Sequence, residues 1–402
     1  MKSKVSLKYL FFTFLKIGAT SWGGFMALIS VVQKNLVERD KVIEDEEILD
    51  GISLASVLPG PVAFNVISFL GYRLRGMKGA LVSMAAILLP SFILILFLTF
   101  IYFEYGQLPV FENFFSGVLP AVSAIIISVA FSMSKKHLKD YKQFVICVVA
   151  ALSLILFQAF YITMLIMAVG AILGYLFYHK SAKSDEHEVS KNSLTSGNPF
   201  IYIAAIFLLV FLIWFVPYLL DGEIQEQFLL QRKIAFTFSG MSLTLFGGGY
   251  VIIPSIQEIV VNSLHWLNNK EFTDAIAMGQ ITPGPIFISA TFIGYKVGGF
   301  IGAVTATLAI FLPPGFLMVF ASRFMDFIKQ SKKITAVFKG LRPAVIGMIF
   351  AAAYTIGKDV EQNWISILIF LAVLIASIRF NVNVVYLIPL SGVLGLILYT
   401  YA

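Results

Sequence analysis

Two proline-glycine-proline elements interrupt otherwise apolar stretches of this sequence. Leu58–Pro61 reads Leu-Pro-Gly-Pro, and Thr282–Pro285 reads Thr-Pro-Gly-Pro. Proline lacks a backbone N–H and its ring clashes with the preceding helical turn, so neither stretch can form one continuous α-helix. A new helix is expected to begin at each final proline, and the N–H groups of its first turn have no acceptor inside the helix. Such free N–H groups, at the positive end of a helix dipole, bind anions.

The residues around these breaks form the predicted anion site. They are Gly60, Pro61, Val62 and Asn65 in the first half of the chain, and Gly284, Pro285, Ile286 and Ser289 in the second. Ser68 and Thr291 follow the breaks and add further hydroxyl groups, although polar residues of this kind also serve contacts between helices. The alternative interpretation of the breaks is a structural kink in two packed helices.

Two further sets of residues are candidates for the same site. The glycine pairs Gly23-Gly24 and Gly247-Gly248 lie midway along apolar stretches, where they permit a second unwinding or close helix packing. Lys16 and Arg342 are basic residues within apolar stretches and offer full positive charge to an oxyanion. The alternative for both basic side chains is an extended position that reaches the membrane surface.

Four acidic residues precede the breaks at matching distances. They are Glu47, Asp50, Glu271 and Asp274. Buried carboxylates can relay protons in coupled transport, and acidic residues also cap helix N-termini. We treat all four as proton-coupling candidates, with capping as the competing interpretation.

The composition places these residues in a membrane. The chain has 402 residues, of which 59% are hydrophobic and 13% charged, and its mean hydropathy is +0.89. Cys147 is the single cysteine, the four histidines have no second ligand at metal spacing, and no phosphate-binding loop is present. We therefore expect no enzyme activity, no cofactor and no metal. The net charge of +7 comes from residues beside apolar stretches, which favours a topology signal over nucleic-acid binding.

Apolar stretches long enough to cross a bilayer recur along the chain. We predict an all-α membrane protein with spans near 9–32, 53–72, 79–103, 114–134, 143–157, 158–178, 200–219, 234–260, 275–294, 299–321, 342–356, 363–378 and 384–400. A polar segment after the sixth span marks a boundary, which gives a first membrane domain at 1–180, a linker with a linking span at 181–231 and a second membrane domain at 232–402. With the N-terminus in the cytoplasm, this arrangement places 20 Lys and Arg residues inside and 7 outside.

The two halves repeat one pattern. Leu58–Pro61 matches Thr282–Pro285 at an offset of 224 residues, and Gly71–Arg73 matches Gly294–Lys296 at 223. An odd number of predicted spans separates equivalent positions, so the second half is expected to enter the membrane in the opposite direction. Inverted repeats are an architecture of secondary transporters, with the substrate site between broken helices at the repeat interface.

The motifs resemble those of the chromate ion transporter family, in its two-domain form. The resemblance is carried by Phe14–Gly18, Gly23-Gly24, Leu58–Pro61 and Gly71–Gly76 in the first half and by Phe246–Tyr250, Gly279-Gln280, Thr282–Pro285 and Ala290–Tyr295 in the second. It implies export of chromate from the cytoplasm and chromate resistance, with sulfate as a chemically similar competitor. We therefore expect a secondary transporter of a tetrahedral oxyanion that works by alternating access in the bacterial inner membrane and is compatible with a homodimer. The alternatives are a channel-like or organic-anion pathway on the same fold and, least favoured, a membrane-bound chromate reductase.

Overall fold

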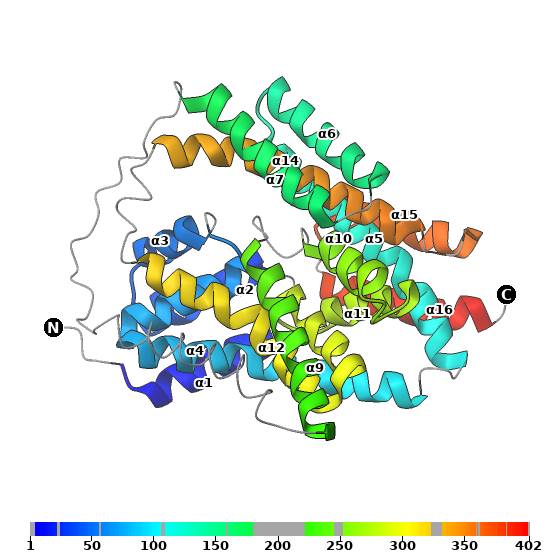
Figure 1. Cartoon of the computed structure of the whole chain (residues 1–402), viewed down its shortest axis with the longest axis horizontal. Helices are drawn as coiled ribbons and strands as arrows, with labels where there is room; N and C mark the ends of the chain where they lie inside the picture. The colour runs from blue at the N-terminus through cyan, green and yellow to red at the C-terminus, as the bar shows by residue number, and fades with distance from the viewer. Residues whose placement is uncertain are drawn as a thin grey trace.

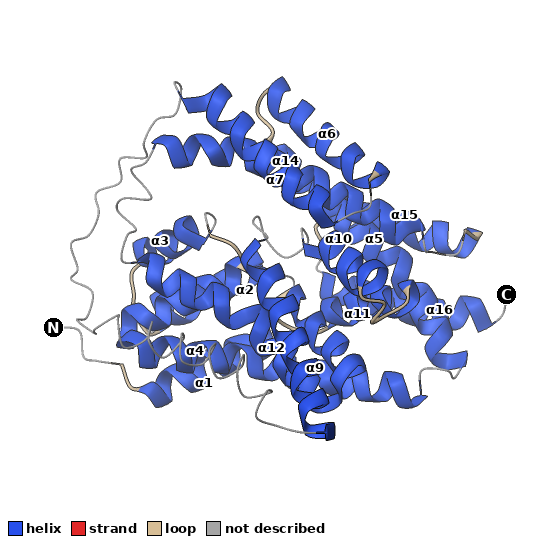
Figure 2. Cartoon of the chain, viewed as in Figure 1, coloured by secondary structure: helices blue, strands red, loops and turns tan. Residues whose placement is uncertain are grey.

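A computed structural model describes residues 5–21, 25–55, 58–105, 109–157, 160–179, 222–244, 252–322, 332–358, 360, 362–382 and 384–400. Within these ranges the regular structure is entirely helical, and Figure 2 shows no strand among the described segments. This confirms the predicted all-α class. The linking span predicted at 200–219 lies outside the described residues.

The first helices of the chain form a hairpin. α1 (Leu7–Thr20) begins at Ser6, whose hydroxyl accepts a hydrogen bond from the backbone of Tyr9, and α2 (Phe25–Gln33) continues into the π-helical turn η1 (Lys34–Arg39). The phenol of Tyr9 donates to the carboxylate of Asp40, just after η1. This contact places the start of α1 beside the end of η1, so the two arms run in opposite directions.

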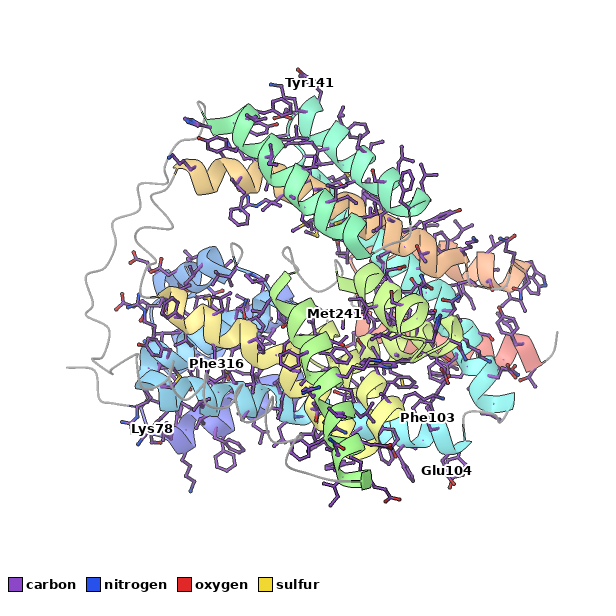
Figure 3. All side chains as sticks on the ribbon, viewed as in Figure 1. Lys78, Phe103, Glu104, Tyr141, Met241 and Phe316 are labelled. Atoms are coloured by element: carbon purple, nitrogen blue, oxygen red, sulfur yellow. The ribbon has the colours of Figure 1, made fainter. Side chains whose placement is uncertain are left out.

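A second hairpin turns at the first proline-glycine-proline element. α3 (Asp45–Ala55) precedes it and α4 (Val62–Tyr105) follows. A Cβ placed on Gly51 would lie 2.9 Å from the ring of Phe69, so α3 lies against the first part of α4. α4 then reverses at Arg75 and Gly76, where the backbone leaves helical angles, with φ of 63° at Gly76. The rest of α4 runs from Lys78 to Glu104, which lie at opposite sides of the molecule in Figure 3.

The second half repeats both hairpins. α9 (Gly222–Thr244) and the segment of α10 (Ile252–Gln257) with η5 (Glu258–Ser263) form the first, and the Lys233 ammonium lies 5.8 Å from the centre of the Trp266 ring. α11 (Asn269–Ile281), the short η6 (Ile286–Ile288) and α12 (Ser289–Ala321) form the second. In it, Lys296 Nζ lies 2.8 Å from Glu271 Oε1, so α12 returns alongside α11. α12 reverses at Gly298 and Gly299 with almost the same backbone angles as the turn in α4.

Three helices complete each half and exchange partners with the other half. They are α5 (Pro109–His137), α6 (Tyr141–Leu156) and α7 (Phe160–Tyr178), then α14 (Lys332–Lys358), α15 (Trp364–Phe380) and α16 (Val384–Thr400). α5 packs on α15 and α16, while its counterpart α14 packs on α6 and α7 (Figure 1). Equivalent glycines permit these close crossings, Gly117 against Gly395 and Gly340 against Gly174.

The outward surfaces of equivalent helices are apolar. α6 exposes Phe144, Val148 and Leu152, and α15 exposes the matching Ile367, Leu371 and Ile375. Stripes of this kind on helices 16 and 17 residues long suit contact with lipid. Four helical segments in the described chain are long and apolar enough to cross a membrane, namely Val62–Tyr105, Glu112–Lys135, Ser289–Ala321 and Ala336–Thr355, and four shorter apolar helices accompany them.

The helices follow most of the predicted span pattern and depart from it at the hairpins. The predicted spans at 79–103, 114–134, 143–157, 158–178, 299–321, 342–356, 363–378 and 384–400 coincide with helices or with the returning parts of α4 and α12. The predicted spans at 53–72 and 275–294 each contain a break and instead belong to hairpins whose two ends lie together. The span at 9–32 is likewise two antiparallel arms, and that at 234–260 has its middle outside the described residues.

Candidate anion-binding site

The backbone is broken at both proline-glycine-proline elements, as the sequence predicts. Gly60 has a φ of 96° and Gly284 a φ of 104°, in a region that favours glycine because a Cβ would be strained there. α4 starts at Val62 directly after Pro61, and η6 starts at Ile286 directly after Pro285. The first-turn N–H groups that follow each break therefore point away from the helix body, towards the tip of the hairpin.

We call the broken segments Leu58–Pro61 and Thr282–Pro285 the hairpin tips. The glycine of each tip lies against a residue of the other half, and these two contacting residues are themselves equivalent in the repeat. A Cβ on Gly60 would lie 2.8 Å from Cγ of the Pro314 ring, and a Cβ on Gly284 would lie 2.5 Å from the hydroxyl of Ser91. Ser91 and Pro314 are related by the 223-residue offset of the repeat. Ser91 Oγ also donates a hydrogen bond to the carbonyl oxygen of Pro283. The two tips are thus held by reciprocal contacts between α4 and α12.

The end of α1 also lies in this region. The backbone N–H of Gly284 donates a hydrogen bond to the carbonyl oxygen of Ser21 across 3.2 Å. Ser21 follows α1 at the tip of the first hairpin and is 1% exposed. The tip of one hairpin from the first half and the tip of one from the second therefore meet inside the protein.

Three buried polar atoms near these tips have no partner among the described residues. They are Ser21 Oγ, Asn65 Oδ1 and Ser289 Oγ. Asn65 and Ser289 are fully buried and occupy equivalent positions in the repeat, each four residues after the final proline of its break. A buried polar atom without a hydrogen bond costs free energy, so native proteins rarely retain one without a water molecule, ion or ligand to satisfy it.

The chemistry of the tips suits an anion held by neutral groups. Serine hydroxyls can donate hydrogen bonds, and the first-turn amides of α4 and η6 can do the same. The amide Nδ2 of Asn65 already donates to the carbonyl oxygen of Pro59 at 2.9 Å. The remaining atom, Oδ1, is an acceptor and does not donate to an anion, so it suits a water molecule or another donor. Phe64, Phe287 and Phe311 pack beside the tips, with ring centres 5.1 and 6.3 Å apart. These apolar rings keep the surroundings low in polarity, which strengthens interactions between an anion and the amide dipoles.

Other predicted site residues have different surroundings. Ser68 Oγ donates to the carbonyl oxygen of Phe64, and Thr291 is bonded to Thr307, so both hydroxyls are satisfied within the protein. Lys16 and Arg342 are exposed and are not part of the buried cluster at the tips. Gly23, Gly24, Gly247 and Gly248 lie outside the described residues, as does the side chain of Ile286.

The four acidic candidates differ in their surroundings. Glu47 accepts a hydrogen bond from the backbone N–H of Glu44, and Glu271 completes a capping box with Asn268. Both therefore cap helices. Asp50 is partly exposed, whereas its counterpart Asp274 is 1% exposed and accepts a 2.7 Å hydrogen bond from the phenol of Tyr102. The structure thus singles out Asp274 as a buried carboxyl group.

Sequence reasoning missed Ser21, Ser91, Tyr102 and Pro314. Ser91 and Pro314 directly follow the repeated prolines Pro90 and Pro313, and this repeat is the signal that would have drawn attention to them. Ser21 directly precedes the region of the first glycine pair. Tyr102 carries no signal in the sequence, because its role depends on a contact with a residue 172 positions away.

Comparisons with known proteins agree with this architecture. The sequence profile of the chromate transporter family matches residues 8–175 and 232–396, which is one match in each half. An uncharacterized transporter of Methanocaldococcus jannaschii is 29% identical over 96% of this chain and 93% of its own length. A probable chromate transport protein of Synechococcus elongatus is 32% identical, covering 92% and 90% respectively. A chromate transport protein of Cupriavidus metallidurans is 31% identical, covering 88% and 83%.

No solved structure matches the chain. The assignment therefore comes from sequence, since the profile covers most of both halves and the relatives align over nearly their whole lengths. The chain belongs to the chromate transporter family.

Proposed function

We propose that this protein is a secondary transporter that exports chromate, or a related tetrahedral oxyanion, from the cytoplasm by alternating access. The proposal is supported by family membership and by relatives named as chromate transport proteins. The observation that carries it is the meeting of buried hairpin tips. There, helix N-termini lie beside the hydroxyls of Ser21 and Ser289, which have no partner within the part of the chain that the structure describes.

The tips favour an anion with several oxygen acceptors. Amides and hydroxyls act only as weak partial charges, so several must converge to replace the water around a dianion. Chromate offers four oxygens in a tetrahedron, and sulfate shares its shape and charge. We therefore infer that sulfate competes with chromate for the same site.

The direction of the halves is part of the proposal. At the far end of α4, Phe103 packs on Phe292 and lies 5.1 Å from the ammonium of Lys296. Phe69 and Arg73 are the first-half counterparts of Phe292 and Lys296. They flank Gly71, which lies against Gly79 and Ser83 at the near end of the returning part of α4. Equivalent residues at opposite ends of one crossing helix support halves that run in opposite directions.

This arrangement implies nine crossings, four in each half and the linking span at 200–219. Each hairpin then enters the membrane and returns to the same side of it. Five basic residues fall on the outer side, namely Arg232, Lys233, Lys270, Lys296 and Lys358. The other Lys and Arg residues fall on the inner side, apart from Lys16 and Arg342 within apolar stretches. The excess of basic residues on the inner side is larger than with thirteen crossings, which supports a cytoplasmic N-terminus.

A difference between equivalent residues supports alternating access. Lys296 and Glu271 form an ion pair at 2.8 Å. Their counterparts Arg73 and Glu47 are both described and form no such ion pair. The guanidinium of Arg73 lies 5.2 Å from the centre of the Phe69 ring, and Glu47 instead accepts a hydrogen bond from the backbone of Glu44. Halves with the same fold but different contacts are expected of a transporter that is closed on one side and open on the other.

The family profile also supports the proposed domains at 1–180 and 232–402, since its two matches fall inside them. Residues 181–231 then connect two membrane domains of opposite direction.

Transport by purified protein in liposomes tests the function. Labelled chromate should enter by a saturable process, sulfate should compete, and unlabelled chromate inside should accelerate uptake by counterflow. Reductants are omitted, because thiols reduce chromate. Linear uptake without counterflow would favour a channel-like pathway, and no uptake of either anion would contradict the proposal.

A further inference from the structure

Asp274 lies in a setting that neither helix capping nor packing explains. It is 1% exposed, its Oδ2 accepts the phenol hydrogen of Tyr102 at 2.7 Å, and its Oδ1 has no partner among the described residues. The ring of Tyr102 is itself packed against Phe103, Phe115 and Phe292, at 5.2 to 5.6 Å between centres. A carboxylate oxygen buried beside aromatic rings is destabilised when charged and is satisfied by taking up a proton.

The charged groups around Asp274 do not neutralise it. Lys270 pairs with Glu112 of α5 at 2.7 Å, and Lys296 of α12 pairs with Glu271 at 2.8 Å. Both neighbouring cations are therefore already matched by carboxylates. α10 and α16 also pack on α11 and bring no charged residue, since their sequences contain none. Among the described residues, no cation therefore pairs directly with Asp274.

Its position links it to the hairpin tips. Asp274 precedes the break at Thr282 by eight residues of α11, about 12 Å along a helix axis. An anion at the tips and an ionised Asp274 repel each other through an interior that salt screens poorly. Binding of the anion and binding of a proton at Asp274 therefore favour each other, and this linkage is reciprocal.

We propose that Asp274 is a proton-binding site, oriented by Tyr102, which takes up one proton when an oxyanion binds at the hairpin tips. The inference rests on the proposed transport function and adds a proton whose binding is linked to that of the anion. Tyr102 belongs to the first half and Asp274 to the second, so the proton acts at a contact between the two halves. The first-half counterpart, Asp50, is partly exposed and so does not share the buried setting of Asp274.

Proton uptake on chromate binding tests this inference directly. Purified protein in weakly buffered solution with a pH-sensitive dye is titrated with chromate, at pH values where chromate is a dianion. The wild type should take up close to one proton per bound chromate. Asp274→Asn should bind chromate, measured by calorimetry, with little or no proton uptake, while the matched control Asp50→Asn keeps the wild-type uptake.

Tyr102→Phe separates a positioning role from a structural one. Without the phenol, the ionised carboxylate loses its donor, so Asp274 should already hold its proton before the anion binds. Proton uptake by this variant should then appear only at higher pH than in the wild type. A purely structural role would leave this pH profile unmoved and would overturn the role of Tyr102.

The possible failures point to different conclusions. Chromate binding with the same proton uptake in Asp274→Asn as in the wild type would overturn the inference and leave the transport proposal standing. Absence of chromate binding in the wild type would overturn the transport proposal itself. If Asp274→Asn fails to fold, equal uptake by wild type and Tyr102→Phe at every pH would still count against the inference.

Discussion

Gly60 of the first half lies against the ring of Pro314 in the second, at a distance that leaves no room for a side chain. The reciprocal contact joins Gly284 to Ser91, the counterpart of Pro314. Each break in the backbone is therefore completed by the other half, and neither half alone forms the proposed site.

Gly60→Ala should destabilise the protein more than a glycine substitution that meets no neighbour. Positive φ costs an alanine about 1 to 2 kcal/mol, and the clash with Pro314 adds about 1 to 3 kcal/mol. Gly222→Ala is the matched control, since Gly222 has a φ of 62° and nothing within 4 Å. Thermal unfolding in detergent, followed by tryptophan fluorescence, measures both. Equal losses of stability would mean that the contact between the halves contributes nothing.

Ser289→Ala should weaken substrate binding without loss of stability. The hydroxyl has no partner among the described residues, so its removal breaks no internal hydrogen bond. One lost hydrogen bond to a dianion should raise the KM for chromate roughly tenfold. Ser391→Ala is the control, because Ser391 is buried in α16 and donates to the carbonyl oxygen of Leu387. An unchanged KM in Ser289→Ala would remove this hydroxyl from the site.

Labelling of single cysteines should show on which side of the membrane the ends of each hairpin lie. In a Cys147→Ala background, cysteines replacing Lys41 and Lys78 should both react with a membrane-impermeant thiol reagent from the cytoplasmic side. A cysteine replacing Lys270 should react from the outer side. An arrangement with a crossing at 53–72 would instead place residues 41 and 78 on opposite sides, and labelling of the two from opposite sides would contradict the hairpin.

The contact that closes the first hairpin should respond to pH. Hydrogen bonds from Arg39, and then from Tyr9, lower the pKa of Asp40 from an ordinary 3.8 to about 2. A lowered pKa stabilises the folded state above the unfolded value, and this stability is lost as the pH falls from about 4 towards 2. Asp40→Asn should therefore be less stable than the wild type at neutral pH, and the gap should close in acid. Thermal unfolding across this pH range measures both proteins, and equal stability of Asp40→Asn and the wild type at neutral pH would contradict this role of Asp40.

The sequence predicted the breaks but not the direction of the chain on either side of them. Proline and glycine in Leu58–Pro61 forbid a continuous helix wherever the chain goes next, so the break followed from local chemistry. Whether α3 and α4 continue or fold back depends on contacts such as Gly51 with Phe69, which hydropathy does not encode. The predicted count of thirteen spans treated each broken stretch as a crossing for this reason.

In the candidate site, too, local sequence predicted some features, and others depended on contacts between distant residues. Asn65 and Ser289 were predicted as donors to the anion because they follow the breaks, and both are buried. Among the described residues the Ser289 hydroxyl has no partner, whereas Asn65 uses its amide donor on Pro59, so the two are not equivalent as ligands. Asp50 and Asp274 were indistinguishable in the sequence, since both precede a break at the same distance. The structure separates them through Tyr102, a partner 172 residues from Asp274 that no local pattern connects to it.

Chromate binding to the purified protein tests the central claim most directly. Calorimetric titration should show saturable binding of chromate to the wild type, displaced by sulfate. The double variant Ser21→Ala and Ser289→Ala should bind at least tenfold more weakly, while Ser391→Ala binds as the wild type does. Equal affinity in the double variant and the wild type would contradict an anion site at the hairpin tips.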